Sequence, residues 1–280
     1  MLQSLFAQQE EGMVWVHFMP APDVSSSRER RLTDMVRSAG AEISVLRVPD
    51  ERLSGLPTKD FTRKATWYRI FLPDLLPELD RILYLDSDLL VLDPVDALLG
   101  TDLGGDCLGA VTNVFQLNHL HRPGALGLAG PREYFNAGVL LMNLEQMRQD
   151  DVTSALLAFA REHTTQIEWR DQDVLNVVLG KRRRPLHPRW NVMNSFRWEH
   201  AAEVFGPAEL EEALSNPAIR HFEGPAENKP WHYLCDRSLR ELYDAYRQRT
   251  PWPRIRRDGI TPRNMLRRAR RRRYSARGVR

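Results

Sequence analysis

The chain has 280 residues, of which 42% are hydrophobic, and this is enough for one substantial globular domain. No apolar run reaches the roughly 18 to 20 residues that a membrane-spanning helix needs, and the first residues lack the basic and then apolar pattern of a signal peptide, so a cytoplasmic protein is predicted. The net charge of +3 conceals two opposite regions, because residues 254–280 hold twelve arginines and one acid, Asp258, and carry +11, which leaves −8 on residues 1–253.

The first elements in chain order are a strand over 13–19, a helix over 26–39 and a strand over 42–48. Ser26 and Glu29 form a capping-box pattern at the start of the helix, and Gly40 follows its end. A strand, a helix and a strand in this order are typical of a parallel crossover unit.

The middle of the chain continues this alternation. A helix over 62–71 precedes a short apolar strand over 81–85. Further strands are predicted over 108–112, 135–142 and 219–222, and further helices over 152–163, 172–179 and 236–249. The alternation predicts an α/β sheet flanked by helices.

The end of the chain differs in composition from the rest. Pro251 and Pro253 should stop the helix before them, and the arginine-rich stretch begins directly afterwards. We therefore expect a folded domain over residues 1–250 and an arginine-rich tail over 251–280.

Two acids stand at the end of the 81–85 strand, in the sequence ILYLDSDLLV. If the backbone stays extended there, Asp86 and Asp88 point to the same side. Carboxylates that converge in this way repel each other unless a divalent cation lies between them, and oxygen ligands suit magnesium or manganese. The alternative is that the acids only end a strand and begin a turn.

A second group lies far along the chain, in IRHFEGPAENKPW over 219–231. His221 ends an apolar strand, Gly224 permits a turn, and Lys229 follows in a loop. A histidine can complete a metal site, and a lysine near such a turn can neutralise a diphosphate oxygen. The alternatives are a core imidazole at His221 and a solvated surface charge at Lys229.

Four separated blocks carry a recognisable pattern: TWYRIFLPDLLP with Arg69, LYLDSD, FNAGVLLMN over 135–143, and HFxGxxxxKPW over 221–231. The block WRDQDVLN over 169–176 fits the same pattern. From about residue 4 to 250 the chain resembles the family 8 glycosyltransferases, a retaining group that includes bacterial lipopolysaccharide galactosyl- and glucosyltransferases and glycogenin.

The resemblance implies an α/β fold of the GT-A type, with a Rossmann-like central sheet that is mixed, mostly parallel and flanked by helices. It implies that manganese, or magnesium, is bound by Asp86, Asp88 and His221 and bridges the two phosphates of a UDP-sugar donor. The residues implied to contact this donor are Arg69, Asp86, Ser87, Asp88, Asn136, Gly224 and Lys229. Asp171 and Gln172 would face the sugar and the acceptor as catalytic residues.

Each of these residues also has an ordinary structural interpretation. Arg69 would then be a surface arginine, and Asn136 would belong to a turn. Asp171 would be the N-cap of the helix that begins at Gln172.

The resemblance implies transfer of a hexose, galactose or glucose, from a UDP-sugar to a glycan or glycolipid acceptor. Family members usually open with a strand that grips the nucleotide base, whereas residues 1–5 resemble the helix after that strand. We therefore expect a catalytic domain that is N-terminally incomplete and lacks its first strand. The alternative is an inactive relic that binds nucleotide sugars.

Clustered arginines in the tail would be attracted to an anionic membrane surface or to nucleic acid, or they would form a solvated, disordered end. The acidic body offers no basic patch interleaved with aromatic residues, which argues against nucleic acid. We expect a cytoplasmic protein with a peripheral contact to the inner membrane face.

Overall fold

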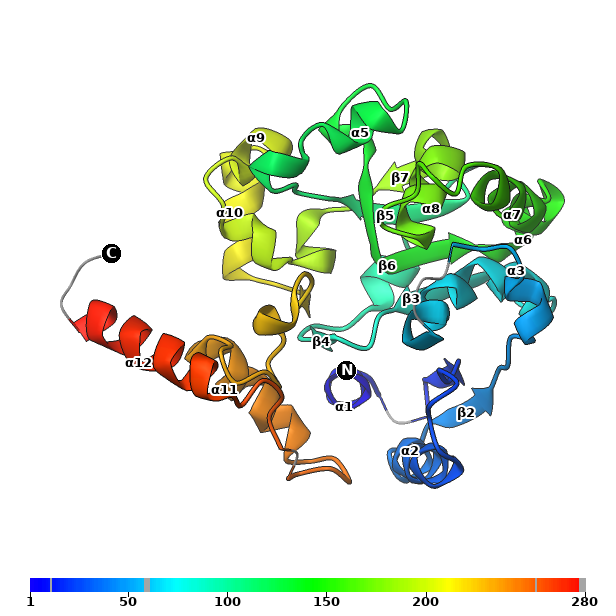
Figure 1. Ribbon diagram of the computed structural model, residues 1–280. Helices are drawn as coiled ribbons and strands as arrows, with labels where there is room; N and C mark the ends of the chain where they lie inside the picture. Colours follow the sequence, from blue (N-terminus) through cyan, green and yellow to red (C-terminus); the bar gives the residue numbers. More distant parts are fainter. Residues whose placement is uncertain (11, 58–60, 255, 277–280) are drawn as a thin grey trace.

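The computed structural model describes residues 1–10, 12–57, 61–254 and 256–276 (Figure 1). Its strands are β1 (Trp15–Phe18), β2 (Glu42–Val45), β3 (Arg81–Leu85), β4 (Leu89–Val91), β5 (Leu108–Thr112), β6 (Phe135–Asn143), β7 (Arg183–Pro185) and β8 (Ile219–His221). The hydrogen-bonded order is β3-β6-β5-β7 in the central sheet, with β1-β2 and β4-β8 as separate pairs.

Strand β6 lies inside the central sheet, and eight of its nine residues are buried. Leu140 and Met142 pack into one hydrophobic cluster, whereas Val139 packs into another. Because successive side chains of a strand point to opposite faces, this strand contributes to a core on each side of the sheet. A nearly continuous apolar run is the composition expected of a strand covered on both faces.

Helices cover both sides of the central sheet (Figure 1). The α-helices are α1 (Leu2–Phe6), α2 (Ser26–Ser38), α3 (Leu72–Leu75), α4 (Asp96–Leu99), α5 (Arg122–Ala125), α6 (Leu144–Gln149), α7 (Val152–Glu162), α8 (Asp171–Leu179), α9 (Ala201–Phe205), α10 (Pro207–Ser215), α11 (Arg237–Arg247) and α12 (Pro262–Ala276). The 3-10 segments that bear on the site are η2 (Phe61–Phe71), η6 (Pro188–Asn191) and η8 (Ala226–Asn228).

The predicted mixed α/β sheet is confirmed. The prediction that most of its strand pairs are parallel is wrong for the described strands. Three pairs are antiparallel, β3-β6, β5-β6 and β4-β8. Two pairs are parallel, β1-β2 and β5-β7. A buried apolar strand has the same sequence pattern in either kind of pair, so strand direction could not be inferred from periodicity.

The N-caps of two predicted helices differ from those expected, although α2 begins at Ser26 as predicted. Ser25, not Ser26, caps α2, and its side chain accepts a bond from the Arg28 amide at 3.4 Å. Helix α8 begins at Asp171, so Asp171 is a helical residue and not the N-cap. The predicted helix over 62–71 is a 3-10 segment.

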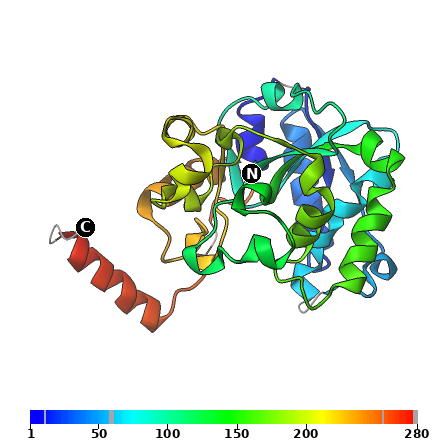
Figure 2. The ribbon, with the colours of Figure 1, turned by 90° about the horizontal axis from the view of Figure 1, so that it is seen from above.

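The C-terminal part of the chain forms helix α12, which projects from the body in both views (Figures 1 and 2). The alternative of a solvated, disordered end is therefore wrong for residues 262–276. Within the described ranges, every helix is too short or too polar to cross a membrane.

Candidate metal and donor site

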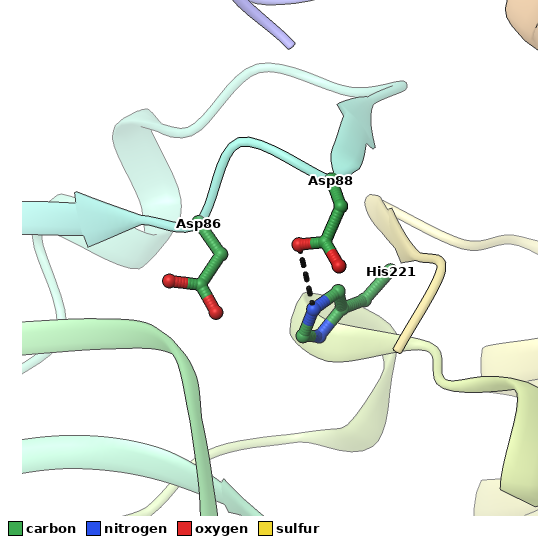
Figure 3. Close-up of side chains that lie close together, drawn as sticks. All are labelled: Asp86, Asp88 and His221. Carbon is green, nitrogen blue, oxygen red and sulfur yellow. Dashed lines mark ion pairs between the residues drawn. The ribbon is translucent and has the colours of Figure 1, made fainter. Parts of the chain in front are cut away.

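Asp86 and Asp88 lie on either side of a turn between β3 and β4 (Figure 3). The Asp86 amide donates to Gly138 O at 2.8 Å, which continues the pairing of β3 with β6. The Asp88 carbonyl accepts from the Phe222 amide at 2.9 Å, which extends the β4-β8 pair. The two carboxylates therefore converge because the chain turns between two sheets. The expected extended backbone at this point is wrong, and exposed Ser87 lies in the turn itself.

His221 completes a group of three side chains with Asp86 and Asp88 (Figure 3). One ligand atom of each lies within 4.8 Å of the others, and His221 Nε2 is 3.2 Å from Asp88 Oδ1. Two carboxylates and an imidazole at this spacing fit a single manganese or magnesium ion.

Two neighbours fix the imidazole of His221. Its Nδ1 is 2.9 Å from Asn191 Oδ1, which leaves Nε2 for the acids. A Cβ added at Gly138 would lie 2.2 Å from Cε1 of the ring, so the imidazole rests directly on the β6 backbone. Hydrogen bonding at the second nitrogen is the usual way in which a metal-binding histidine is oriented.

Arg69 connects Asp171 to the three side chains of Asp86, Asp88 and His221, here called the metal group. Its Nη2 is 3.2 Å from Asp86 Oδ1, and its Nε is 2.9 Å from Asp171 Oδ2. The guanidinium also donates to Ala137 O and lies 4.4 Å from the centre of the Tyr84 ring. Arg69 is 4% exposed, so the interpretation as a surface arginine is wrong.

Asn136 and Gln172 connect the two halves of the site. Asn136 lies in β6, so its interpretation as a turn residue is wrong. Its Oδ1 accepts from Asn191 Nδ2 at 2.9 Å, and Gln172 Oε1 accepts from the Ala137 amide at 3.0 Å. The side-chain Nε2 of Gln172 also donates to the Tyr134 hydroxyl at 3.2 Å. A chain of polar contacts thus runs from the imidazole to the start of α8.

Lys229 is presented by residues 223–235, here called the donor loop. Its ammonium pairs with Asp88 Oδ2 and donates to Phe222 O at 2.7 Å, so it is not a freely solvated charge. Gly224 has φ +88°, a backbone conformation that favours glycine, at the turn where the loop leaves β8. All the residues predicted for the donor and metal therefore lie in one region, around the ends of β3, β6 and β8.

The charges in this region are strongly coupled. Burial alone would raise the pKa of Asp88, but His221 and Lys229 outweigh it and hold that pKa well below its ordinary value. Burial opposes protonation of His221, but Asp88 outweighs this and raises the imidazole pKa. Burial raises the pKa of Asp171 to about 6, against the opposing attraction of Arg69.

Two site residues were missed in the sequence, Asn191 and Tyr84. Tyr84 donates its hydroxyl to Asp86 Oδ1 at 2.7 Å. Its position near the end of β3, two residues before Asp86, was a usable signal. Asn191 gave no local signal, because its function depends on contacts with residues distant in the sequence.

The family described as glycosyl transferase family 8 matches residues 5–235. The general stress protein A of Bacillus subtilis (strain 168) is 28% identical over 235 residues, which are 82% of this chain and 80% of that protein. The lipopolysaccharide 1,3-galactosyltransferase of Salmonella typhimurium is 26% identical over 255 residues, 89% of this chain and 72% of that protein.

Among solved structures, the galactosyltransferase LgtC in complex with donor and acceptor sugar analogs is similar, with a TM-score of 0.77 and 27% identity over 89% of this chain and 90% of that chain. These matches define the class, a glycosyltransferase, and confirm the predicted fold class. Because the family match covers most of the sequence, the chain belongs to glycosyl transferase family 8. The galactosyl- and glucosyltransferases among its relatives agree with the narrower hexosyltransferase class.

Proposed function

We propose that the chain is a retaining hexosyltransferase that moves galactose or glucose from a UDP-sugar to a glycan or glycolipid acceptor of the lipopolysaccharide type. A manganese or magnesium ion would be held by Asp86, Asp88 and His221. The observation that carries the proposal is the convergence of these three side chains beside Lys229, although they come from distant parts of the sequence. The family match and the name of the Salmonella relative support it.

The leaving group determines what the site must do. Transfer breaks the bond between the anomeric carbon and a diphosphate oxygen, and negative charge develops on that diphosphate. The ammonium of Lys229 is held at the metal group and would neutralise part of this charge. A bound divalent cation would supply further positive charge to the same oxygens.

Retention is explained most simply by a front-face displacement. The acceptor hydroxyl oxygen bonds to the anomeric carbon on the side that the diphosphate leaves, and its proton passes to a departing phosphate oxygen. Gln172 is a poor nucleophile, and Asp171 is held against Arg69, so we assign these two residues to orienting the sugar and the acceptor. Trapping a covalent sugar adduct on the protein would contradict this mechanism.

The experiment that tests the function is a hydrolysis screen of nucleotide sugars with and without manganese, which needs no acceptor. We expect release of UDP and a hexose only when the divalent ion is present. Hydrolysis independent of metal, or the absence of hydrolysis from every UDP-hexose, would reject the proposed activity. Tight binding of a UDP-sugar without turnover would favour the inactive relic.

The metal group is tested by Asp88→Asn. Loss of one metal carboxylate should lower hydrolysis by about 100-fold or more, since such a group contributes several kcal/mol to transition-state stabilisation. Asp80→Asn, at an acid whose side chain is 80% exposed, is the matched control. Circular dichroism should show an unchanged fold for both, and near-normal turnover of the Asp88→Asn variant would refute the metal site.

We also propose that the protein is cytoplasmic and binds the inner membrane face through α12. Three apolar side chains on or beside this helix are exposed, Ile260, Met265 and Leu266. Arginines surround them in the sequence. Basic segments with exposed apolar residues are attracted to anionic lipid surfaces.

A further inference from the structure

Residues 256–268, here called the C-terminal segment, pair with the donor loop through the main chain. The amide of Asp258 donates to Trp231 O at 3.0 Å, and the amide of Tyr233 donates to Asp258 O at 2.8 Å. Two bonds of this kind form one parallel β-bridge. The segment is thus attached to the loop in a defined register.

Gly259 packs directly on the ring of His232 in the donor loop. A Cβ added at Gly259 would lie 1.9 Å from Nε2 of this imidazole, and the φ of Gly259 is +72°, so only glycine fits here. His232 is 7% exposed, and its Nδ1 accepts from the Leu234 amide at 3.2 Å. The side chain of Asn264 donates to Gly259 O at 2.8 Å, which connects this contact to α12.

Arginines of the C-terminal segment hold the loop on both sides of Lys229. Nη1 of Arg257 donates at 3.1 Å to the carbonyl of Pro230, the residue after Lys229. Nη2 of Arg257 donates to Asp244 of α11 at 2.7 Å. Arg267 forms a two-point ion pair, at 2.5 and 3.2 Å, with Glu227, two residues before the lysine.

These contacts differ in strength. The Arg267–Glu227 pair is about two-fifths exposed on both sides, and pairs of this kind contribute little alone. The packing of Gly259 on His232 excludes water, and Arg257 is only partly exposed, so these contacts should dominate. The donor loop is therefore contacted on both sides of Lys229 by a segment that lies outside the residues matched by the family.

We propose that the C-terminal segment is a clamp that positions Lys229 for the departing diphosphate, with Arg257 and Gly259 as positioning residues. The inference rests on the proposed function of Lys229. It also assigns the first part of the arginine-rich end to the catalytic domain, and leaves the later part of α12 for other contacts.

The first test compares donor hydrolysis by the full chain and its Arg257→Ala and Gly259→Ala variants. We expect kcat/KM to fall about three- to tenfold, as for one or two lost hydrogen bonds. Arg257→Lys, which can still donate to Pro230, should recover part of the loss. Arg263→Ala, at an exposed arginine of helix α12, should match the wild type. Unchanged kinetics in both clamp variants would overturn the clamp.

A double-mutant cycle separates positioning from general damage. In the Lys229→Ala background, Arg257→Ala should change kcat/KM by no more than about twofold, because the group that it positions is gone. A merely structural residue would cause the same loss in both backgrounds. Additive losses would therefore overturn the inference.

A measurement independent of activity uses hydrogen–deuterium exchange over residues 226–235. Gly259→Ala should speed exchange of these amides, whereas Arg263→Ala should leave it unchanged. Equal exchange in Gly259→Ala and the wild type would overturn the clamp even in an inactive protein. A wild type without metal-dependent hydrolysis would instead reject the proposed function, so the two failures are distinguishable.

Discussion

Gly138 controls how closely the imidazole of His221 approaches strand β6. We predict that Gly138→Ala weakens manganese binding about 10- to 100-fold, the usual effect of disturbing the surroundings of a metal ligand, because the new Cβ would displace the ring. Titration calorimetry measures the affinity. Gly105→Ala, where a Cβ would meet open space, is the control. Unchanged affinity in the Gly138→Ala variant would exclude His221 as a ligand.

The grouping of Asp86, Asp88 and His221 could be predicted from the sequence because each of these residues belongs to a local motif. Asp86 and Asp88 are two residues apart, and His221 stands in a block with its own glycine and lysine. Asn191 could not be found in this way. It orients His221 through a contact across the fold, and its neighbours along the chain carry no matching pattern.

At the scale of elements, the start of α8 depends on one buried ion pair. Asp173 is fully buried, pairs with Arg122, and accepts from the Trp169 amide at 2.7 Å and the Tyr134 hydroxyl at 2.7 Å. The turn before the helix holds Arg170 at φ 51°, an uncommon conformation for a non-glycine residue. The pair therefore maintains the turn that precedes Asp171 and Gln172 at the start of α8.

Arg122→Ala should destabilise the protein by about 3 kcal/mol, because it leaves a buried carboxylate without its charged partner. Urea unfolding measures the loss. Arg237→Ala, which breaks an exposed pair with Glu241, should cost less than about 0.5 kcal/mol. A loss below about 1 kcal/mol for Arg122→Ala would show that the other donors to Asp173 suffice.

The pair of strands β1 and β2 should be sensitive to acid. Burial holds the pKa of His17 below its ordinary value, and His17 Nδ1 is 2.7 Å from Ser44 Oγ on the neighbouring strand. The imidazole of His17 is therefore protonated less readily in the folded protein than in the unfolded chain. Stability is therefore lost as the pH falls below about 6.5, toward the lower pKa of the folded state.

We predict that the melting temperature of the wild type falls more between pH 7 and pH 5 than that of His17→Gln. Scanning fluorimetry at several pH values measures this difference. His121→Gln, at an exposed histidine, should follow the wild type. An equal fall of the melting temperature in all three proteins would show that His17 does not contribute to the loss of stability in acid.

Elements with strong periodicity or apolar runs were predictable, including the strands over 81–85 and 108–112, which the structure reproduces at the same residues. The 3-10 geometry of 61–71 was not, since apolar spacing hardly separates it from an α-helix over a few turns. Helix α12 was missed because its clustered arginines were interpreted by their charge alone, as a site for a membrane or nucleic acid or as a solvated end. Its Pro262 at the first helical position was an available signal.

For the whole molecule, the separation of the basic residues 254–280 from the acidic rest of the chain predicts that the basic end binds an anionic membrane. A full-length variant with glutamine at residues 270–273 keeps the clamp residues and removes four charges. Each arginine near an anionic surface contributes roughly 1 kcal/mol, so binding to phosphatidylserine-rich vesicles should fall more than about tenfold. Vesicle sedimentation at low and high salt measures this, with phosphatidylcholine vesicles as the control. Equal sedimentation of both proteins would reject the membrane contact.

The β4-β8 pair, in which Leu89 lies opposite His221, brings together residues from distant parts of the chain. A shift of this register by one residue would turn the imidazole to the other face of the strand. A folding intermediate without this pairing has two carboxylates but no histidine beside them. A divalent ion should therefore bind the finished fold much more tightly than such an intermediate, and its main kinetic effect should be slower unfolding.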